Sequence, residues 1–211
     1  MDSLRIIADR YGLFIVEDAA QAHGAKYKSK VIGSVGTVAW SFYPTKNLGA
    51  WGDAGAVTTN SSTISREIIP LRNYGSVVKY ENDIKGINSR LDPMQAAILN
   101  IKLKHLKTWT QNRKNVAKQY SDGLKNSGLI TPYVPSWADP AWHLYVIRHP
   151  ERKEFQKRLH KAGVNTVIHY PIPPHLQKAY AGANFVKGQF PLSEKLANEV
   201  LSLPMCPAQS D

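Results

Sequence analysis

The chain has 211 residues, and its hydrophobic content of 43% is normal for a folded protein with one large domain or a domain and a half. Its 27 Lys and Arg residues outnumber 16 Asp and Glu residues, and the net charge of +11 favours an anionic partner, either nucleic acid or a phosphorylated small molecule. The only cysteine, Cys206, excludes a disulfide framework and a thiolate-rich metal site. No apolar run reaches the roughly 18 residues of a membrane helix, and no signal peptide opens the chain, so we expect a cytoplasmic protein without membrane contact.

The first sixty residues alternate between helical and strand-like segments. A helix is predicted over residues 3–11, ended by Gly12, and the apolar run LFIVEDAA after it is too short for a helix and predicts a buried strand. After a lysine-rich hairpin near residues 27–30, TVAWSFY and GAVTTN predict two more strands. Strands that alternate with helices indicate an α/β sheet covered on both faces.

Two helices and a proline-rich link occupy the middle of the chain. Asp92 and Pro93 fit the N-cap and first position of one helix, and a second helix is predicted over residues 109–125. The link TPYVPSWADP then indicates a boundary between domains at residues 1–130 and 131–211.

The last eighty residues predict a small α+β domain. AWHLYVIR and VNTVIHY are typical of strands, and the helix ERKEFQKRLHKAG between them is closed by Gly163. SEKLANEVLSL predicts a last helix.

Polar residues end two of the predicted strands in the first domain. Asp18 ends LFIVED, and Ser41 and Lys46 close the next strand. Ligands of open α/β sheets bind beyond the carboxyl ends of strands, which makes these residues candidates for a site. A carboxylate and a lysine here can form an ordinary ion pair. The alternative is a pyridoxal phosphate pocket, in which the lysine forms a Schiff base with the cofactor aldehyde and the carboxylate keeps the ring nitrogen protonated.

Three evenly spaced glycines follow this lysine. Gly49, Gly52 and Gly55 allow φ values and a close backbone approach that other residues resist, so we expect a sharp turn after Lys46 and then the next strand. An ordinary glycine turn is the alternative. A dinucleotide-binding fingerprint is excluded, because these glycines lead into a strand and not into a helix.

Several separate segments carry a resemblance to a known family. They are VEDAAQAHG, SFYPTKNLGAWGDAGA, LRNYGS, RLDPMQAA, VIHYPIPPHLQKAY and VLSLPMCP. Together they resemble the DegT-type nucleotide-sugar aminotransferases, which are pyridoxal phosphate enzymes. The resemblance implies an α/β aspartate-aminotransferase-like fold (fold type I), with a partial large cofactor-binding domain over residues 1–130 that includes long interdomain helices.

The family pattern implies a role for each matching residue around the cofactor. Lys46 is the Schiff-base lysine and, once released, the acid and base that moves a proton. Asp18 pairs with the pyridinium nitrogen, Gln21 contacts the cofactor ring or its hydroxyl, and Ser41 donates to the phosphate. Asn88 resembles an asparagine that reaches this phosphate from a second subunit, which implies a homodimer.

The resemblance also implies a substrate and its contacts. Residues near the sugar nucleotide are Tyr43, Arg90, His169 and Tyr170, although a lone histidine is often structural. The amino-acid sequences of these motifs are most similar to the branch of the family that aminates C3 of dTDP-3-keto-6-deoxyhexoses, with glutamate as the usual amino donor. The remaining histidines have no spacing typical of metal ligands, so we predict no metal.

The chain also departs from this family. Full-length relatives carry an N-terminal half, with a phosphate loop and several strands, that we do not find here, so independent catalysis by these 211 residues is doubtful. Two alternatives stay open, a non-catalytic remnant that dimerises or binds nucleotide sugar and a basic protein that binds nucleic acid. Related sugar dehydratases have histidine at the lysine position, and Lys46 argues against them.

Overall fold

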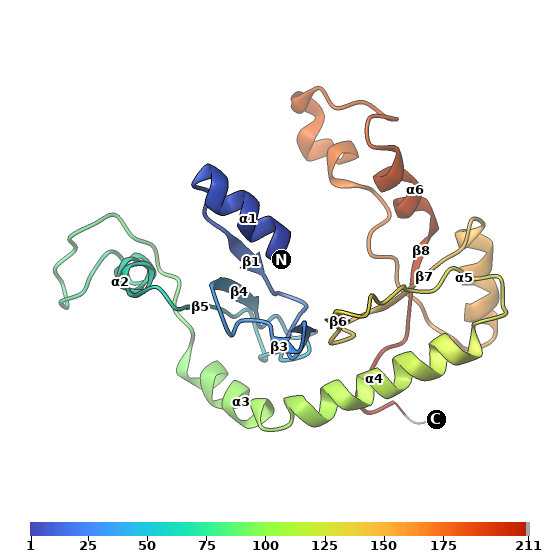
Figure 1. The fold of residues 1–211 in the computed structure, drawn as a ribbon, viewed down its shortest axis with the longest axis horizontal. Helices are drawn as coiled ribbons and strands as arrows, with labels where there is room; N and C mark the ends of the chain where they lie inside the picture. The colour runs from blue at the N-terminus through green and yellow to red at the C-terminus, as the bar shows by residue number, and fades with distance from the viewer. Residues whose placement is uncertain (210–211) are drawn as a thin grey trace. The chain divides into compact units, whose positions relative to one another are not determined.

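A computed structural model of the chain describes residues 1–209 and divides into two compact units (Figure 1). The first unit comprises residues 1–110 and 136–141, and the second comprises residues 111–135 and 142–211, of which residues up to 209 are described. None of the described helices is both long and apolar enough to cross a bilayer.

The main sheet of the first unit has three strands in the order β1-β4-β5 (Figure 1). β1 (Val16–Asp18) pairs in parallel with β4 (Thr37–Ser41), and β5 (Gly55–Thr59) pairs with β4 in the antiparallel direction. Helix α1 (Asp2–Tyr11) precedes β1 and ends at Gly12, which adopts φ +61° as a left-handed C-cap. The predicted helix and three strands are therefore confirmed.

The rest of the first unit consists of a second small sheet and further helices. The small sheet has the order β3-β2-β6, formed by β2 (Lys26–Tyr27), β3 (Lys30–Val31) and β6 (Ala138–Asp139). The helices are α2 (Ser62–Leu71), α3 (Pro93–Leu103) and α4 (Leu106–Gly123), the last of which continues into the second unit. A modest core forms around Leu48, Ala50 and Leu99.

Two features of this unit differ from the sequence prediction. The first strand was expected to be buried, but Leu13, Phe14 and Val16 are 60%, 66% and 57% exposed. This expectation is wrong because β1 is an edge strand that pairs only with β4 among the described residues. Helix α2 was not predicted, and its start is set by Ser61, whose side chain accepts a hydrogen bond from the Ile64 N–H at 3.3 Å.

The second unit is built on a two-stranded antiparallel sheet. β7 (Tyr145–Arg148) pairs with β8 (Val200–Leu203), and α5 (Arg152–Lys161) lies against β8. Two short 3₁₀ segments and a helix precede β8, namely η1 (Pro174–Leu176), η2 (Lys178–Ala183) and α6 (Pro191–Glu199). The core gathers residues from α4 and from both strands: Ala117, Tyr145, Ile147, Leu201 and Leu203.

Two predictions for the second unit are wrong. VLSL was expected to end the last helix, but α6 stops at Glu199 and VLSL forms β8. A short apolar run such as VLSL is compatible with either a helix or a strand. Here, backbone pairing with β7 makes it a strand. VNTVIHY was expected to be a strand, but only one isolated bridge forms there, between Val167 and Ser202.

Candidate functional site

Asp18 and Ser41 lie at the carboxyl ends of neighbouring strands and on the same face of the sheet. Asp18 is the last residue of β1 and pairs with Ala39 of β4. Paired residues share a face, and side chains alternate along a strand, so Asp18, Ala39 and Ser41 point to the same side. Asp18 is exposed, and its Oδ1 accepts a hydrogen bond from the Ala20 N–H at 2.9 Å.

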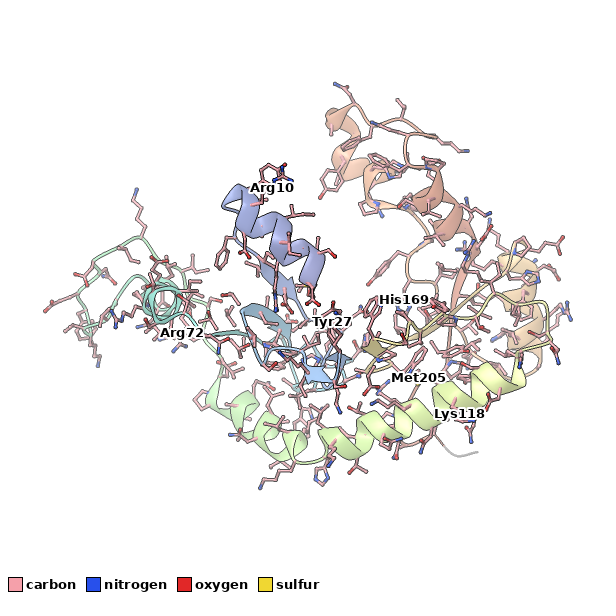
Figure 2. The ribbon with its side chains drawn as sticks, viewed as in Figure 1. Arg10, Tyr27, Arg72, Lys118, His169 and Met205 are labelled. Atoms are coloured by element: carbon pink, nitrogen blue, oxygen red, sulfur yellow. The ribbon has the colours of Figure 1, made fainter. Side chains whose placement is uncertain are left out.

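A cavity of about 650 Å³ lies beside the ends of β4 and β5. Its polar and charged lining includes Ser41, Tyr43, Asp53, Arg72 and Arg90. Figure 2 labels Arg72, which directly follows α2. Two guanidinium groups against one carboxylate give this cavity a positive balance, and a hydroxyl group adds a further donor. The arrangement suits an anionic ligand.

The guanidinium of Arg90 is held by three neighbours. Its Nε donates to Asn88 Oδ1 at 3.2 Å, and its Nη1 donates to Asn73 Oδ1 at 3.3 Å. Its Cζ also lies 5.4 Å from the centre of the Tyr74 ring, in a cation–π contact. These contacts orient Arg90 and connect the exposed Asn88 to a residue of the cavity wall.

Lys46 lies in the turn that follows β4. Its backbone N–H donates to the Tyr43 carbonyl at 2.9 Å. Gly49 provides the expected close approach, because a Cβ there would lie 2.3 Å from the Pro44 carbonyl oxygen. The expectation of special φ values is wrong, since none of the three glycines has a positive φ: Gly49, Gly52 and Gly55.

His23 is a buried histidine close to this lysine. Its ring packs against the rings of Trp40, at 5.2 Å between centroids, and Phe42, at 5.8 Å, and it is 3% exposed. Within residues 1–209, neither ring nitrogen has a hydrogen-bond partner. Burial, together with a smaller effect of the charge of Lys46, lowers the pKa of His23 from 6.5 to about 4. The imidazole is therefore neutral at neutral pH.

The structure brings together part of the predicted set. Ser41, Tyr43 and Arg90 line one cavity, whereas Asp18, Gln21 and Lys46 do not line it. Gln21 is exposed and follows β1 by three residues.

His169 and Tyr170 lie in the second unit and line a different cavity, of about 250 Å³. His169 is half-buried, and its Nδ1 lies 2.8 Å from Ser202 Oγ on β8. Its ring meets the Tyr170 ring edge to face at 5.5 Å between centroids. The remaining wall of this cavity is mostly apolar. Figure 2 labels His169 within this unit.

Sequence reasoning missed four residues that the structure places in or behind these cavities. Asp53 and Arg72 line the larger cavity, and neither has a spacing that signals a site. His23 was considered only as a metal ligand, and Ser202 was assigned to a helix. In the part of the chain that is described, no three His, Cys, Asp or Glu side chains gather closely enough to hold a metal ion.

Comparisons with known proteins assign the chain to a family. The model of the DegT/DnrJ/EryC1/StrS aminotransferase family matches residues 1–211. The chain is 49% identical over 209 residues to dTDP-3-amino-3,4,6-trideoxy-alpha-D-glucose transaminase of Streptomyces venezuelae, with 98% of this chain and 55% of that protein covered. It is 49% identical over 211 residues to dTDP-3-amino-3,6-dideoxy-alpha-D-galactopyranose transaminase of Aneurinibacillus thermoaerophilus, with 100% of this chain and 58% of that protein covered.

A solved structure agrees with this assignment. The crystal structure of S. venezuelae DesV in complex with a ketimine intermediate matches with a TM-score of 0.97 and 48% identity, and the match covers 100% of this chain and 57% of that chain. The fold is therefore that of the aspartate-aminotransferase-like (fold type I) enzymes, and the chain belongs to the DegT/DnrJ/EryC1/StrS aminotransferase family. The predicted family and fold class are confirmed. The chain spans between 55% and 58% of the length of these two curated relatives.

Proposed function

We propose that the protein containing this chain transfers an amino group to a keto sugar linked to a nucleotide diphosphate, with pyridoxal 5'-phosphate as its cofactor. The substrate class follows the two curated relatives, which are named as transaminases of dTDP-linked 3-amino sugars. A dTDP-3-keto-6-deoxyhexose and glutamate are the acceptor and donor that the motifs favour. A cytoplasmic location remains a prediction from the sequence.

One observation supports this proposal most directly. Asp18 and Ser41 lie on the same face of the sheet, and Lys46 follows Ser41 closely in the chain. Pyridoxal phosphate presents a ring nitrogen, an aldehyde and a phosphate. A carboxylate, an amine and a hydroxyl group near one edge of a sheet match these three groups in their chemistry. The residues present therefore fit the cofactor.

Each of these side chains has a separate task in the proposed reaction. The bound cofactor supplies an electron-accepting ring and a reactive aldehyde. The Asp18 carboxylate holds a proton at the ring nitrogen, and Ser41 donates a hydrogen bond to the phosphate. Lys46 would hold the cofactor through its amine and, when free, would move a proton between the donor Cα and the cofactor C4′. Gln21 contacts the cofactor ring or its hydroxyl.

Substrate binding is assigned to residues of both units. Tyr43 and Arg90 line the positively balanced cavity of the first unit, and a diphosphate favours cationic and N–H donors of this kind. His169 and Tyr170 line the cavity of the second unit and are assigned to the sugar nucleotide. Arg72 adds a further cation for the diphosphate in the first cavity.

We also propose that the protein works as a homodimer in which Asn88 of one copy completes the site of the other. Asn88 is exposed, and the loop before it exposes apolar side chains that include Val77 (70%), Tyr80 (87%) and Ile87 (66%). Exposed apolar groups in one loop favour burial against another protein surface.

A mixing experiment tests the reaction and the shared site together. Lys46→Ala and Asn88→Ala variants of the complete protein are each expected to lose amino transfer to dTDP-3-keto-6-deoxyhexose. A mixed dimer holds one site with both changes and one with neither, so refolding equal amounts together should restore about a quarter of wild-type activity. Activity in Lys46→Ala alone would contradict the catalytic assignment. Two inactive variants without recovery on mixing would contradict only the shared site.

A further inference from the structure

Ser202 is a buried hydroxyl group placed directly behind His169. Its residue is 4% exposed, and its Oγ lies 2.8 Å from His169 Nδ1. The backbone of Ser202 is held by neighbours on both sides. Ser202 pairs with Val146 of β7 on one side. On the other side its carbonyl accepts from the Val167 N–H at 3.2 Å, and its N–H donates to the Val167 carbonyl at 2.8 Å. The backbone therefore holds this hydroxyl group in place beneath a histidine that lines a cavity.

The direction of this hydrogen bond follows from the proton of the hydroxyl group. A serine side chain carries one donor and two acceptor positions. If Nδ1–H donated to Oγ, the buried Ser202 proton would need a second acceptor, and within residues 1–209 the Oγ forms no hydrogen bond other than the one with His169. A buried donor without a partner is costly, whereas an unused acceptor position costs less. The hydroxyl group therefore donates to Nδ1, and the ring proton of neutral His169 stays on Nε2.

We propose that Ser202 is a positioning residue that holds His169 in the Nε2–H tautomer, so that the imidazole presents a donor to an oxygen acceptor of the nucleotide sugar. The inference rests on the proposed function, because that function makes the cavity of His169 a substrate site. A neutral imidazole in this tautomer donates through Nε2 and does not accept there. The site then favours a carbonyl or phosphate oxygen over a group that can only donate.

The surroundings of His169 strengthen this effect. The cavity wall beside it includes Ile172, Pro173, Leu196 and Val200. A hydrogen bond is stronger in a less polar setting, and a donor that is already oriented loses less freedom on binding. Without this hydrogen bond, neutral His169 would populate both tautomers, and its Nε2 would be a donor in only one of them.

The tautomer is measured directly by ¹⁵N NMR of the complete protein labelled at histidine, without substrate and with the imidazole in its neutral form. The wild-type spectrum should show His169 protonated at Nε2 and unprotonated at Nδ1. Ser202→Ala should shift the populations toward a mixture, and Ser202→Thr, which keeps the hydroxyl group, should retain the wild-type pattern. Asn165→Ala is the matched control, since Asn165 contacts the Nδ1 of a different histidine, His160, at 3.1 Å. A wild-type Nδ1–H tautomer, or an unchanged spectrum in Ser202→Ala, would overturn the proposal.

Kinetics then separate this inference from the function on which it rests. Ser202→Ala should raise KM for the nucleotide sugar about three- to tenfold with a smaller change in kcat, as expected for one weakened hydrogen bond. Ser202→Thr should restore KM to within about twofold, because the donor returns. An unchanged KM in Ser202→Ala would overturn the positioning role. Absence of amino transfer by the wild-type protein would instead contradict the proposed function, while the NMR spectrum still decides the tautomer.

Discussion

The two units of the chain differ in how completely they bury their apolar side chains. In the second unit, Tyr145, Ile147 and Leu201 are each 0% exposed and pack together across β7 and β8. In the first unit, the segment from α1 to β1 leaves Leu13 and Phe14 more than half exposed. The unit with the more complete core is not the unit that carries Asp18, Ser41 and Lys46.

This difference has a physical consequence for the candidate site. Burial of apolar surface is the main favourable term in folding, so the second unit has more stabilisation within its own residues. The first unit positions its polar residues through strand ends and a tight turn, with a smaller core behind them. Its site therefore depends more on local backbone geometry than on a core behind it.

Replacing one leucine in each unit gives the largest expected contrast. Leu201→Ala removes a fully buried side chain and should lower the free energy of unfolding by about 2–5 kcal/mol. Leu13→Ala changes a side chain that is 60% exposed and should cost less than about 0.5 kcal/mol. Urea denaturation of both variants measures the two values. Equal losses would show that Leu13 is covered in solution, and the contrast between the units would be wrong.

The pH dependence of stability tests the buried histidine of the first unit. Because burial lowers the pKa of His23 from 6.5 to about 4, the unfolded chain binds this proton at a higher pH than the folded chain does. The free energy of unfolding should therefore fall as the pH drops from about 6.5 to about 4, by up to about 3 kcal/mol from this residue, and level off below.

The control for this effect is the variant His23→Leu, which removes the titrating group. Its stability should lack this component of the slope between pH 6.5 and 4, and the difference between the two curves isolates His23. If the two proteins lost stability in parallel, the imidazole would not be held neutral by burial next to Lys46.

A smaller effect is expected at the turn after Lys46. Gly49→Ala places a Cβ against the Pro44 carbonyl and should cost about 1–3 kcal/mol. Gly123→Ala is the matched control, because nothing lies within 4 Å of its Cβ position and it ends helix α4. Gly123→Ala should raise the free energy of unfolding, by no more than about 1 kcal/mol. Thermal unfolding compares them, and similar melting temperatures would show that the turn is not tightly packed.

The sequence predicted local features well where one physical signal dominates. Gly12 ends α1 as expected, and α3 begins at Pro93 directly after Asp92 as expected, although the Asp92 side chain makes no capping hydrogen bond. It failed at VLSL, where the apolar pattern suits both a helix and a strand and pairing with β7 decides. The burial of β1 was also misjudged, since burial depends on which segments cover a strand and not on the strand itself.

The candidate site was predictable only in part. Residues at strand ends, such as Asp18 and Ser41, follow from the rule that ligands bind beyond the carboxyl ends of strands. Arg72 and His23 carry no comparable signal, because long-range packing brings one to the cavity and buries the other. Ser202 could not be found while its segment was read as a helix. The family resemblance supplied the roles that these patterns alone left open.

The most direct test of the account is chemical labelling of Lys46. The complete protein is incubated with pyridoxal phosphate, reduced with borohydride and digested, and the mass of each lysine peptide is measured. The account predicts that the reduced cofactor is added to the peptide that contains Lys46 and is absent from that position in Lys46→Ala, while Lys79→Ala leaves the label unchanged. A complete protein in which the Lys46 peptide stays unmodified, or carries no more label than the peptides of exposed lysines, would contradict it.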